Sequence, residues 1–338
     1  MQTAHFGAFT LESGRTLPQI DIAYHTYGSL SPQADNVVWV CHALTANSDV
    51  ADWWPGTIAP GRFLDPEKYF VVCANVLGSC YGTTGPLSIN PDTGKPYFRD
   101  FPALTMRDVV KAHRLLAGHL GIGSIRALVG SSVGGFQAVE WAVQQPGRFG
   151  RLALIATDAI ATPWAIAIDE TQRMAITADP TYALDTPEGG AAGLAAARAI
   201  GLLTYRGGQG YNMTQRSPEE AYARGVPHRA CTYQQYQGQK LVRRFDAYSY
   251  MAILNTFDTH NVGRGRGGVE AALATISCPA MVIGLSTDII FTPEEMKALA
   301  AMIPGARYAQ LSSPFGHDGF LVEADALNSL LKPFIDND

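Results

Sequence analysis

The sequence predicts an α/β protein built on a mostly parallel central sheet. Several short, continuously apolar runs, typical of strands buried on both faces, alternate along the chain with segments of helical periodicity. Apolar residues make up 47% of the 338 residues and charged residues only 16%, so the chain can bury a large core. A glycine-rich turn also joins one of these apolar runs directly to a helical segment. These three observations together indicate parallel strands connected by helices.

The predicted elements follow one another in a regular order. Residues 8–12 and 20–27 alternate between apolar and polar side chains and predict two antiparallel strands around the turn Ser13-Gly14-Arg15. Buried strands are predicted at residues 37–41, 70–74, 125–129, 151–157, 279–285 and 306–311, with a helix at 106–120 and a final helix from about Leu321. The order of strands and helices is that of a single α/β core.

The strand pattern stops between residues 158 and 276, where helical and loop sequence replaces it. This interval includes an alanine-rich segment at 190–203 and a charged segment at 240–257. We therefore expect a core formed by residues 1–160 and 277–338, with residues 161–276 inserted as a helical lid.

The pentapeptide Gly130-Ser131-Ser132-Val133-Gly134 has the form G-x-S-x-G and lies between a predicted strand and a predicted helix. A strand, this turn and a helix form the nucleophile elbow of α/β-hydrolase-type enzymes. We therefore predict an α/β-hydrolase fold with Ser132 as nucleophile. The backbone N–H of Val133 would stabilise negative charge that forms beside Ser132. The alternative is a Gly/Ser-rich loop that matches the motif by chance.

A nucleophilic serine needs a base and an acid, which in this fold follow it in the order Ser, acid, His. Asp288 follows the predicted strand at 279–285, and His317 lies in a glycine-flanked loop after the next strand. Asp318 is a rival acid, but it adjoins the base in sequence and is badly placed to brace its far nitrogen. The histidines that lack this context are His5, His25, His113, His119, His228 and His260. The sequence predicts the triad Ser132, Asp288 and His317.

The loop after the strand at 37–41 is expected to supply the second oxyanion-hole donor. It reads His42-Ala43-Leu44-Thr45-Ala46-Asn47-Ser48, and Leu44 is the candidate donor, with Thr45 as its neighbour. We expect His42 to support this loop through a hydrogen bond rather than to transfer protons.

Charge and composition argue against several functional classes. The net charge of −5 gives no electrostatic reason to expect nucleic acid or an anionic membrane as a partner. No run approaches the ~20 apolar residues of a membrane span, and the first six residues do not resemble a signal peptide. The five cysteines are scattered, and no His/Cys/acid spacing suggests a metal site. We expect a cytoplasmic protein with reduced thiols and no bound cofactor or metal.

Several ordered blocks, spread over almost the whole chain, resemble the homoserine O-acetyltransferase family of α/β-hydrolase-fold acyltransferases. They include 42–45, 75–78, 82–86, 88–91, 100–102, 134–141, 244–247, 263–268 and 316–320. The chain departs from the family pattern at the elbow, where Gly130-Ser131-Ser132-Val133-Gly134-Gly135 stands for the usual Gly-Gly-Ser-Met-Gly-Gly. It departs again after Thr45, where Ala46-Asn47 replace Gly-Asp.

The resemblance implies an acetyl-CoA-dependent, ping-pong acetylation of homoserine in methionine biosynthesis, by a homodimer joined through its lid helices. It also implies that Arg198 holds the substrate carboxylate, that Tyr205 faces the same direction and that Asp318 pairs with the substrate ammonium. The alternatives are that Arg198 is a solvent-facing charge on the lid and that Asp318 braces a loop.

Three other functions remain alternatives on the sequence alone. One is a carboxylesterase or acetyl esterase of the same fold, and another is a relative that uses succinyl-CoA or L-serine. The third is a ligand-binding protein on an inactive scaffold, against which the intact triad argues. Residues 263–268 imitate a dinucleotide-binding motif, but no strand precedes them, so we expect a structural turn, with contact to a phosphate of CoA as the alternative.

Overall fold

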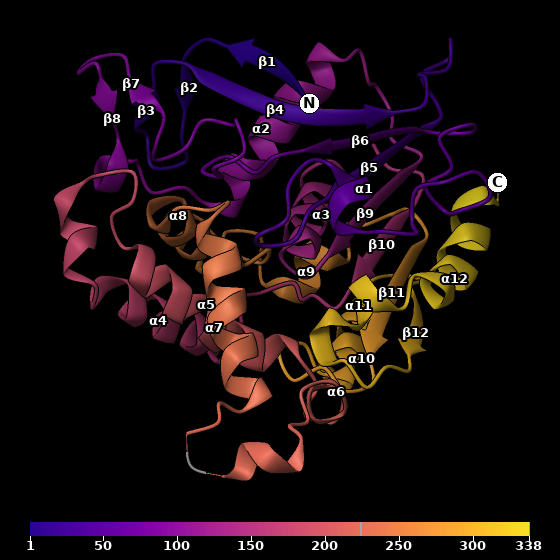
Figure 1. Ribbon diagram of the computed structural model, residues 1–338. Helices are drawn as coiled ribbons and strands as arrows, with labels where there is room; N and C mark the ends of the chain where they lie inside the picture. The colour runs from indigo at the N-terminus through magenta and orange to yellow at the C-terminus, as the bar shows by residue number, and fades with distance from the viewer. Residues whose placement is uncertain (224, 338) are drawn as a thin grey trace.

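The computed structural model describes residues 1–223 and 225–337. Residue 224, in the predicted lid, and residue 338, at the end of the predicted core, lie outside the described residues. The described chain forms one eight-stranded sheet surrounded by helices (Figure 1). In spatial order the strands are β1 Gln2–Phe6, β4 Ile20–Tyr27, β6 Phe70–Ala74, β5 Val37–Cys41, β9 Ala127–Ser131, β10 Leu152–Ile155, β11 Ala280–Leu285 and β12 Arg307–Leu311.

The sheet is mostly parallel, as the sequence predicts. Strand β4 is antiparallel to β1 and β6, and every pairing from β6 to β12 is parallel. The carboxyl ends of the parallel strands therefore share one edge, the edge at which ligands bind in such sheets. Strands β9, β11 and β12 bring the elbow, the predicted acid and the predicted base to this edge.

Alternate residues of the strands enter two different hydrophobic clusters, one on each face of the sheet. On β5, Trp39 belongs to one cluster and Val38 and Val40 to the other. The helices α2 Met106–His119, α3 Val133–Gln144 and α10 Pro293–Met302 pack on the Trp39 side, and α12 Ala324–Asp336 packs on the opposite side. Burial of both faces explains why these strands are continuously apolar.

Helices fill the interval between β10 and β11, and the described part of that interval has no strand apart from one isolated bridge between Ile160 and Asn261. Helices α4, α5, α7 and α8 stand beside the sheet, and the segment between α6 and α7 projects from the body (Figure 1). Their bounds are α4 Pro163–Thr177, α5 Ala191–Tyr205, α6 Gly208–Thr214, α7 Arg229–Val242, α8 Ala247–Asp258 and α9 Val269–Leu273. The remaining short helices are α1 Val50–Trp53 and α11 Gly319–Val322.

The predicted strand pairing in the N-terminal region was wrong. The predicted pairing of residues 8–12 with 20–27 does not form, because β2 Phe9–Thr10 pairs with β3 Thr16–Leu17 in a small separate sheet. Instead β4 pairs with β1, a strand that the sequence did not predict. A second small sheet joins β7 Ile89–Asn90 to β8 Lys95–Pro96. The alternating pattern of residues 20–27 predicts a strand but does not specify its partner.

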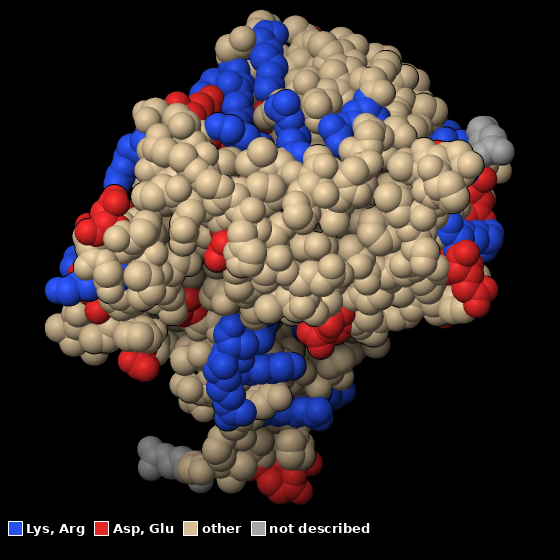
Figure 2. Space-filling view, turned by 90° about the horizontal axis from the view of Figure 1, so that it is seen from above, with Lys and Arg blue, Asp and Glu red and all other residues tan. Residues whose placement is uncertain are grey.

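Charged residues make up only 16% of the sequence. Most of the face in Figure 2 belongs to uncharged residues, with basic side chains gathered in separate groups. Within the described chain, no helix is long and apolar enough to span a membrane.

Candidate active site

Ser132 lies in a strained turn between β9 and α3. Its φ of 55° and ψ of −129° are unusual for a residue with a side chain. The neighbouring glycines make this turn possible, because a Cβ on Gly130 would lie 2.3 Å from Gly134 O and one on Gly134 would lie 2.1 Å from Cys41 O. The strand and the helix can therefore approach closely only with glycine at these positions.

The three predicted triad residues form a hydrogen-bonded chain. Ser132 Oγ lies 2.8 Å from His317 Nε2, and His317 Nδ1 lies 2.7 Å from Asp288 Oδ2. The other carboxylate oxygen of Asp288 accepts hydrogen bonds from the backbone N–H groups of Ile290 and Phe291. All three side chains are buried. The arrangement matches a nucleophile, a base and an acid that orients the base.

The electrostatic surroundings of His317 favour its protonated form. Burial lowers the pKa of this imidazole, but the charge and hydrogen bond of Asp288, helped by the charge of Asp318, more than compensate and raise it above its usual value. A base with a raised pKa accepts the serine proton more readily, and the buried carboxylate stabilises the cation that forms.

Other histidines that could compete for the base role form hydrogen bonds with residues that do not belong to the triad. His5 is bonded to Asp21, His25 to Ser48 and His113 to Gln137. The ring of His260 lies 3.1 Å from the backbone oxygen of Asp158.

His42 supports the loop that precedes Leu44. The N–H of Val76 donates to His42 Nε2 at 3.1 Å, so His42 Nδ1–H donates to the oxygen of Ala43 at 2.9 Å. Burial lowers the pKa of His42 to about 4, so the ring is neutral near pH 7 and keeps this tautomer. These contacts fit a structural role for His42.

The backbone donors predicted for the oxyanion hole lie at the same site. Val133 is the first residue of α3, and Leu44, Thr45 and Val133 all line the cavity that contains Ser132. Among the described residues we find no hydrogen-bond acceptor for the N–H of Leu44 or of Val133. Both N–H groups thus remain available to a ligand.

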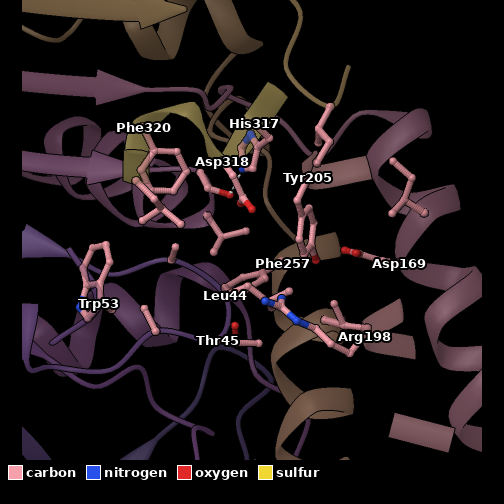
Figure 3. Close-up of a pocket in the computed structure, with 18 of the residues that line it drawn as sticks. Leu44, Thr45, Trp53, Asp169, Arg198, Tyr205, Phe257, His317, Asp318 and Phe320 are labelled. Atoms are coloured by element: carbon pink, nitrogen blue, oxygen red, sulfur yellow. Dashed lines mark hydrogen bonds between the residues drawn. The ribbon is translucent and has the colours of Figure 1, made fainter. Parts of the chain in front are cut away.

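The cavity above Ser132 has a volume of about 710 Å³ and lies between the sheet edge and the helices of the predicted lid. Ser132 is among the residues that line it. His317 of the core and Arg198 and Tyr205 of α5 line it as well (Figure 3). The volume lies within the range of about 300–1,000 Å³ typical of small-molecule sites.

Arg198 and Tyr205 lie together on α5, two helical turns apart. The guanidinium of Arg198 lies 5.6 Å from the centre of the Tyr205 ring, a cation–π contact. Among the described residues Arg198 forms no ion pair, and its side chain points into the cavity (Figure 3). Burial raises the pKa of Tyr205 to about 12, so its hydroxyl stays protonated. Arg198 is therefore positioned to bind an anionic group.

Asp318 also lines the cavity, and it has a partner that the sequence did not reveal. Its Oδ2 lies 2.7 Å from Nε of Arg206, the residue after α5. Burial raises the pKa of Asp318, against the effects of Arg206, His317 and Arg198. Asp318 makes no hydrogen bond to His317, whereas Asp288 does. The ion pair between Asp318 and Arg206 connects the end of α5 to the loop that carries His317.

The cavity contains a second acidic residue that the sequence did not predict to lie there. Asp169 of α4 points toward the hydroxyl of Tyr205 (Figure 3) and lies beside Asp258 of α8. Asp258 is bound by Arg173 at 2.7 Å. Burial and the charge of Asp258 raise the pKa of Asp169 well above its usual value. No local motif marks this pair, because it forms only when α4 and α8 pack together.

Residues 263–268 form a turn and a bend, as expected. Arg264 is paired with Glu12 at 2.7 Å and Arg266 with Glu140 at 2.6 Å. The segment does not contribute to the cavity around Ser132. Both arginines are thus engaged in structural ion pairs.

Comparison with known proteins agrees with this geometry. Residues 36–324 match the model of the alpha/beta hydrolase fold family. The chain is 44% identical over 327 residues to the homoserine O-acetyltransferase of Cyclobacterium marinum, covering 97% of this chain and 92% of the relative. The chain belongs to the homoserine O-acetyltransferase family. This membership agrees with the resemblance of the sequence blocks.

Solved structures show the same fold in proteins with two different names. The homoserine O-acetyltransferase from Bacillus anthracis superimposes with a TM-score of 0.91 at 24% identity, covering 100% of this chain and 98% of that one. Esterase E22 superimposes with a TM-score of 0.90 at 23% identity, covering 99% of both chains. The fold of the homoserine O-acetyltransferase family is therefore shared with an esterase, and the acceptor must be decided by the site.

Proposed function

We propose that this protein is an acyltransferase that moves an acetyl group from acetyl-CoA to the γ-hydroxyl of L-homoserine, a step of methionine biosynthesis. The observation that carries the proposal is the shared cavity, in which the Ser132–His317–Asp288 chain faces Arg198, a cation without a carboxylate partner in the described chain. The 44% identity to a named homoserine O-acetyltransferase supports it.

In the first half-reaction Ser132 attacks the thioester carbon. His317 Nε2, 2.8 Å from the serine oxygen, takes the proton, and Asp288 holds the imidazolium. The N–H groups of Val133 and Leu44 would stabilise the oxyanion. The tetrahedral intermediate collapses, the carbon–sulfur bond breaks, and the thiolate leaves with the proton from His317.

In the second half-reaction the γ-hydroxyl of homoserine attacks acetyl-Ser132. His317 accepts the hydroxyl proton and returns it to the serine oxygen as the ester bond to the enzyme breaks. Arg198 would bind the substrate carboxylate through two parallel hydrogen bonds. Asp318 would accept the ammonium with the oxygen that Arg206 leaves unpaired.

The residues proposed to bind the amino acid support transfer over hydrolysis. A triad serves an esterase equally well, but an esterase of neutral substrates has no need of a cation in its cavity. An unpaired charge in such a place costs several kcal/mol unless a ligand compensates for it. Arg198 therefore favours an anionic acceptor over water.

The proposal is tested by thiol release from acetyl-CoA and succinyl-CoA, each with L-homoserine, L-serine or no acceptor. We expect release to require acetyl-CoA and to rise steeply with homoserine, and O-acetylhomoserine to accumulate in the same amount as the thiol. Release that is equally fast without an amino acid would identify a hydrolase, and a preference for succinyl-CoA or serine would identify a relative with another specificity.

The assembly and compartment are further parts of the proposal. We propose a cytoplasmic homodimer joined through the helices inserted between β10 and β11. Exposed apolar side chains on α5, α6 and α7, namely Leu203, Met213 and Tyr236, support this surface as the contact. Light scattering coupled to gel filtration measures the mass, and a monomer would contradict the expected dimer.

A further inference from the structure

The cavity that contains Ser132 has a second charged region, separate from the residues that we propose bind homoserine. It is formed by Lys240, near the end of α7, and by Arg244, just beyond that helix, and both residues line the cavity. Both residues are exposed. Figure 2 shows that basic side chains gather where the helical insertion projects from the body.

These two cations lack the carboxylate partners that Arg206 and Arg173 have. Arg206 is paired with Asp318 and Arg173 with Asp258, whereas neither Lys240 nor Arg244 forms an ion pair within the described residues. The acidic side chain at this end, Asp52, lies 3.5 Å from the amide nitrogen of Asn47. Two cations against one carboxylate leave this end of the cavity positive.

Arg244 is held in place without being neutralised. Its guanidinium donates to the backbone oxygen of Thr45 and to the hydroxyl of Tyr81, both uncharged acceptors. A guanidinium has five N–H donors, so others remain for a ligand. Because Thr45 follows the proposed oxyanion donor Leu44, the cation stands beside the loop that faces Ser132.

We infer that Lys240 and Arg244 form the binding site for the phosphates of a CoA thioester, with its pantetheine arm running through the cavity to Ser132. The inference rests on the proposed function, since it names where that donor is held. A cavity of about 710 Å³ exceeds the needs of one small amino acid, and the long arm accounts for the remaining space. The alternative phosphate site at residues 263–268 has its arginines already paired with Glu12 and Glu140.

The test measures the KM values of two acetyl donors with the wild-type enzyme and with the Lys240→Gln variant. Acetyl-CoA carries the phosphates, and S-acetylpantetheine carries the same thioester arm without them. We expect the variant to raise the KM for acetyl-CoA by roughly three- to tenfold, the effect of losing one partly solvated charge contact, and to leave the KM for S-acetylpantetheine within about twofold. Lys240 is exposed and makes no interaction of its own in the described chain, so the variant should fold. Arg244 is unsuitable as the decisive variant because it supports Thr45.

A matched control comes from Lys95, an exposed lysine that does not line this cavity. Lys95→Gln makes the same change in net charge and should alter neither KM. Raising the ionic strength should raise the wild-type KM for acetyl-CoA, and less so that of Lys240→Gln, since salt screens an exposed charge contact.

An equal change in the KM values for both donors, or no change in either value, would contradict the proposed phosphate-binding site. These results are distinguishable from failure of the proposed function. If Lys240→Gln behaves like wild type while homoserine is still acetylated, the phosphate site alone is wrong. If neither donor yields O-acetylhomoserine with the wild-type enzyme, the proposed transferase is wrong.

Discussion

Replacing Arg198 by alanine separates transfer to an amino acid from ester hydrolysis. The side chain stacks on Tyr205 at 5.6 Å and has no carboxylate partner in the described chain. A homoserine carboxylate that binds there is largely removed from water, so its unpaired charge would be costly in the variant. Loss of one partner of a desolvated charge pair costs about 2–4 kcal/mol in kcat/KM. This corresponds to a roughly 30- to 700-fold decrease with homoserine.

The assay is thiol release from acetyl-CoA at subsaturating homoserine, run beside hydrolysis of p-nitrophenyl acetate. The neutral ester needs only the triad and the oxyanion donors, so Arg198→Ala should retain its hydrolysis within about tenfold. Arg198→Lys keeps the charge but cannot bind a carboxylate bidentately, and it should fall between wild type and the alanine variant. Equal damage to both reactions would refute a substrate-binding role and identify Arg198 as structural. The esterase interpretation would then gain support.

Three further predictions concern the catalytic residues. Ser132→Ala should lower kcat by about 10⁴–10⁶, and wild-type enzyme given acetyl-CoA alone should carry an acetyl group on Ser132 by mass spectrometry; substantial residual activity would exclude Ser132 as nucleophile. Asp288→Asn should lower kcat by roughly 10⁴ because the wrong tautomer of His317 is favoured, whereas Asp318→Asn should mainly raise the KM for homoserine, and exchanged phenotypes would mean that the two roles are reversed. Since the pKa of His317 is raised and its neutral form is the base, kcat/KM should decline as the pH falls through a value above 6.5; Asp288→Asn should shift this limb to lower pH, and an unshifted limb would assign it to another group.

The triad could be predicted from the sequence because each member follows a local pattern. Ser132 lies in a glycine-rich strand–turn–helix motif, and Asp288 and His317 each follow a strand of the parallel sheet. Parallel strands end at one edge, so these local positions imply proximity in space. The strands of the sheet centre were predictable for the same reason, since β5 and β6 have the predicted bounds, 37–41 and 70–74. The strand before the elbow was displaced: β9 is Ala127–Ser131, and Ile125 makes only an isolated bridge with Phe149.

The partners contributed by the inserted helices could not be predicted in this way. The Arg206–Asp318 contact depends on how the end of α5 meets the loop of His317, where a Cβ on Gly207 would lie 2.5 Å from Pro314 O. The pairing of Asp169 with Asp258 depends similarly on the packing of α4 against α8. Helical periodicity shows which face of a helix is buried, but it does not show which other helix covers that face.

The distribution of charge in the cavity explains how one triad could favour transfer over hydrolysis. Asp318, which is paired with Arg206, lies close enough to Arg198 for their charges to interact, so a zwitterion there can have both of its charges matched. Unpaired cations lie at the end lined by Lys240 and Arg244, where a polyanionic donor gains attraction. Water gains no charge pairing in either region, whereas homoserine gains it in the first region and the CoA thioester gains it in the second. In the proposed function, the triad supplies the chemistry, and the side chains of the inserted helices select the molecules that reach Ser132.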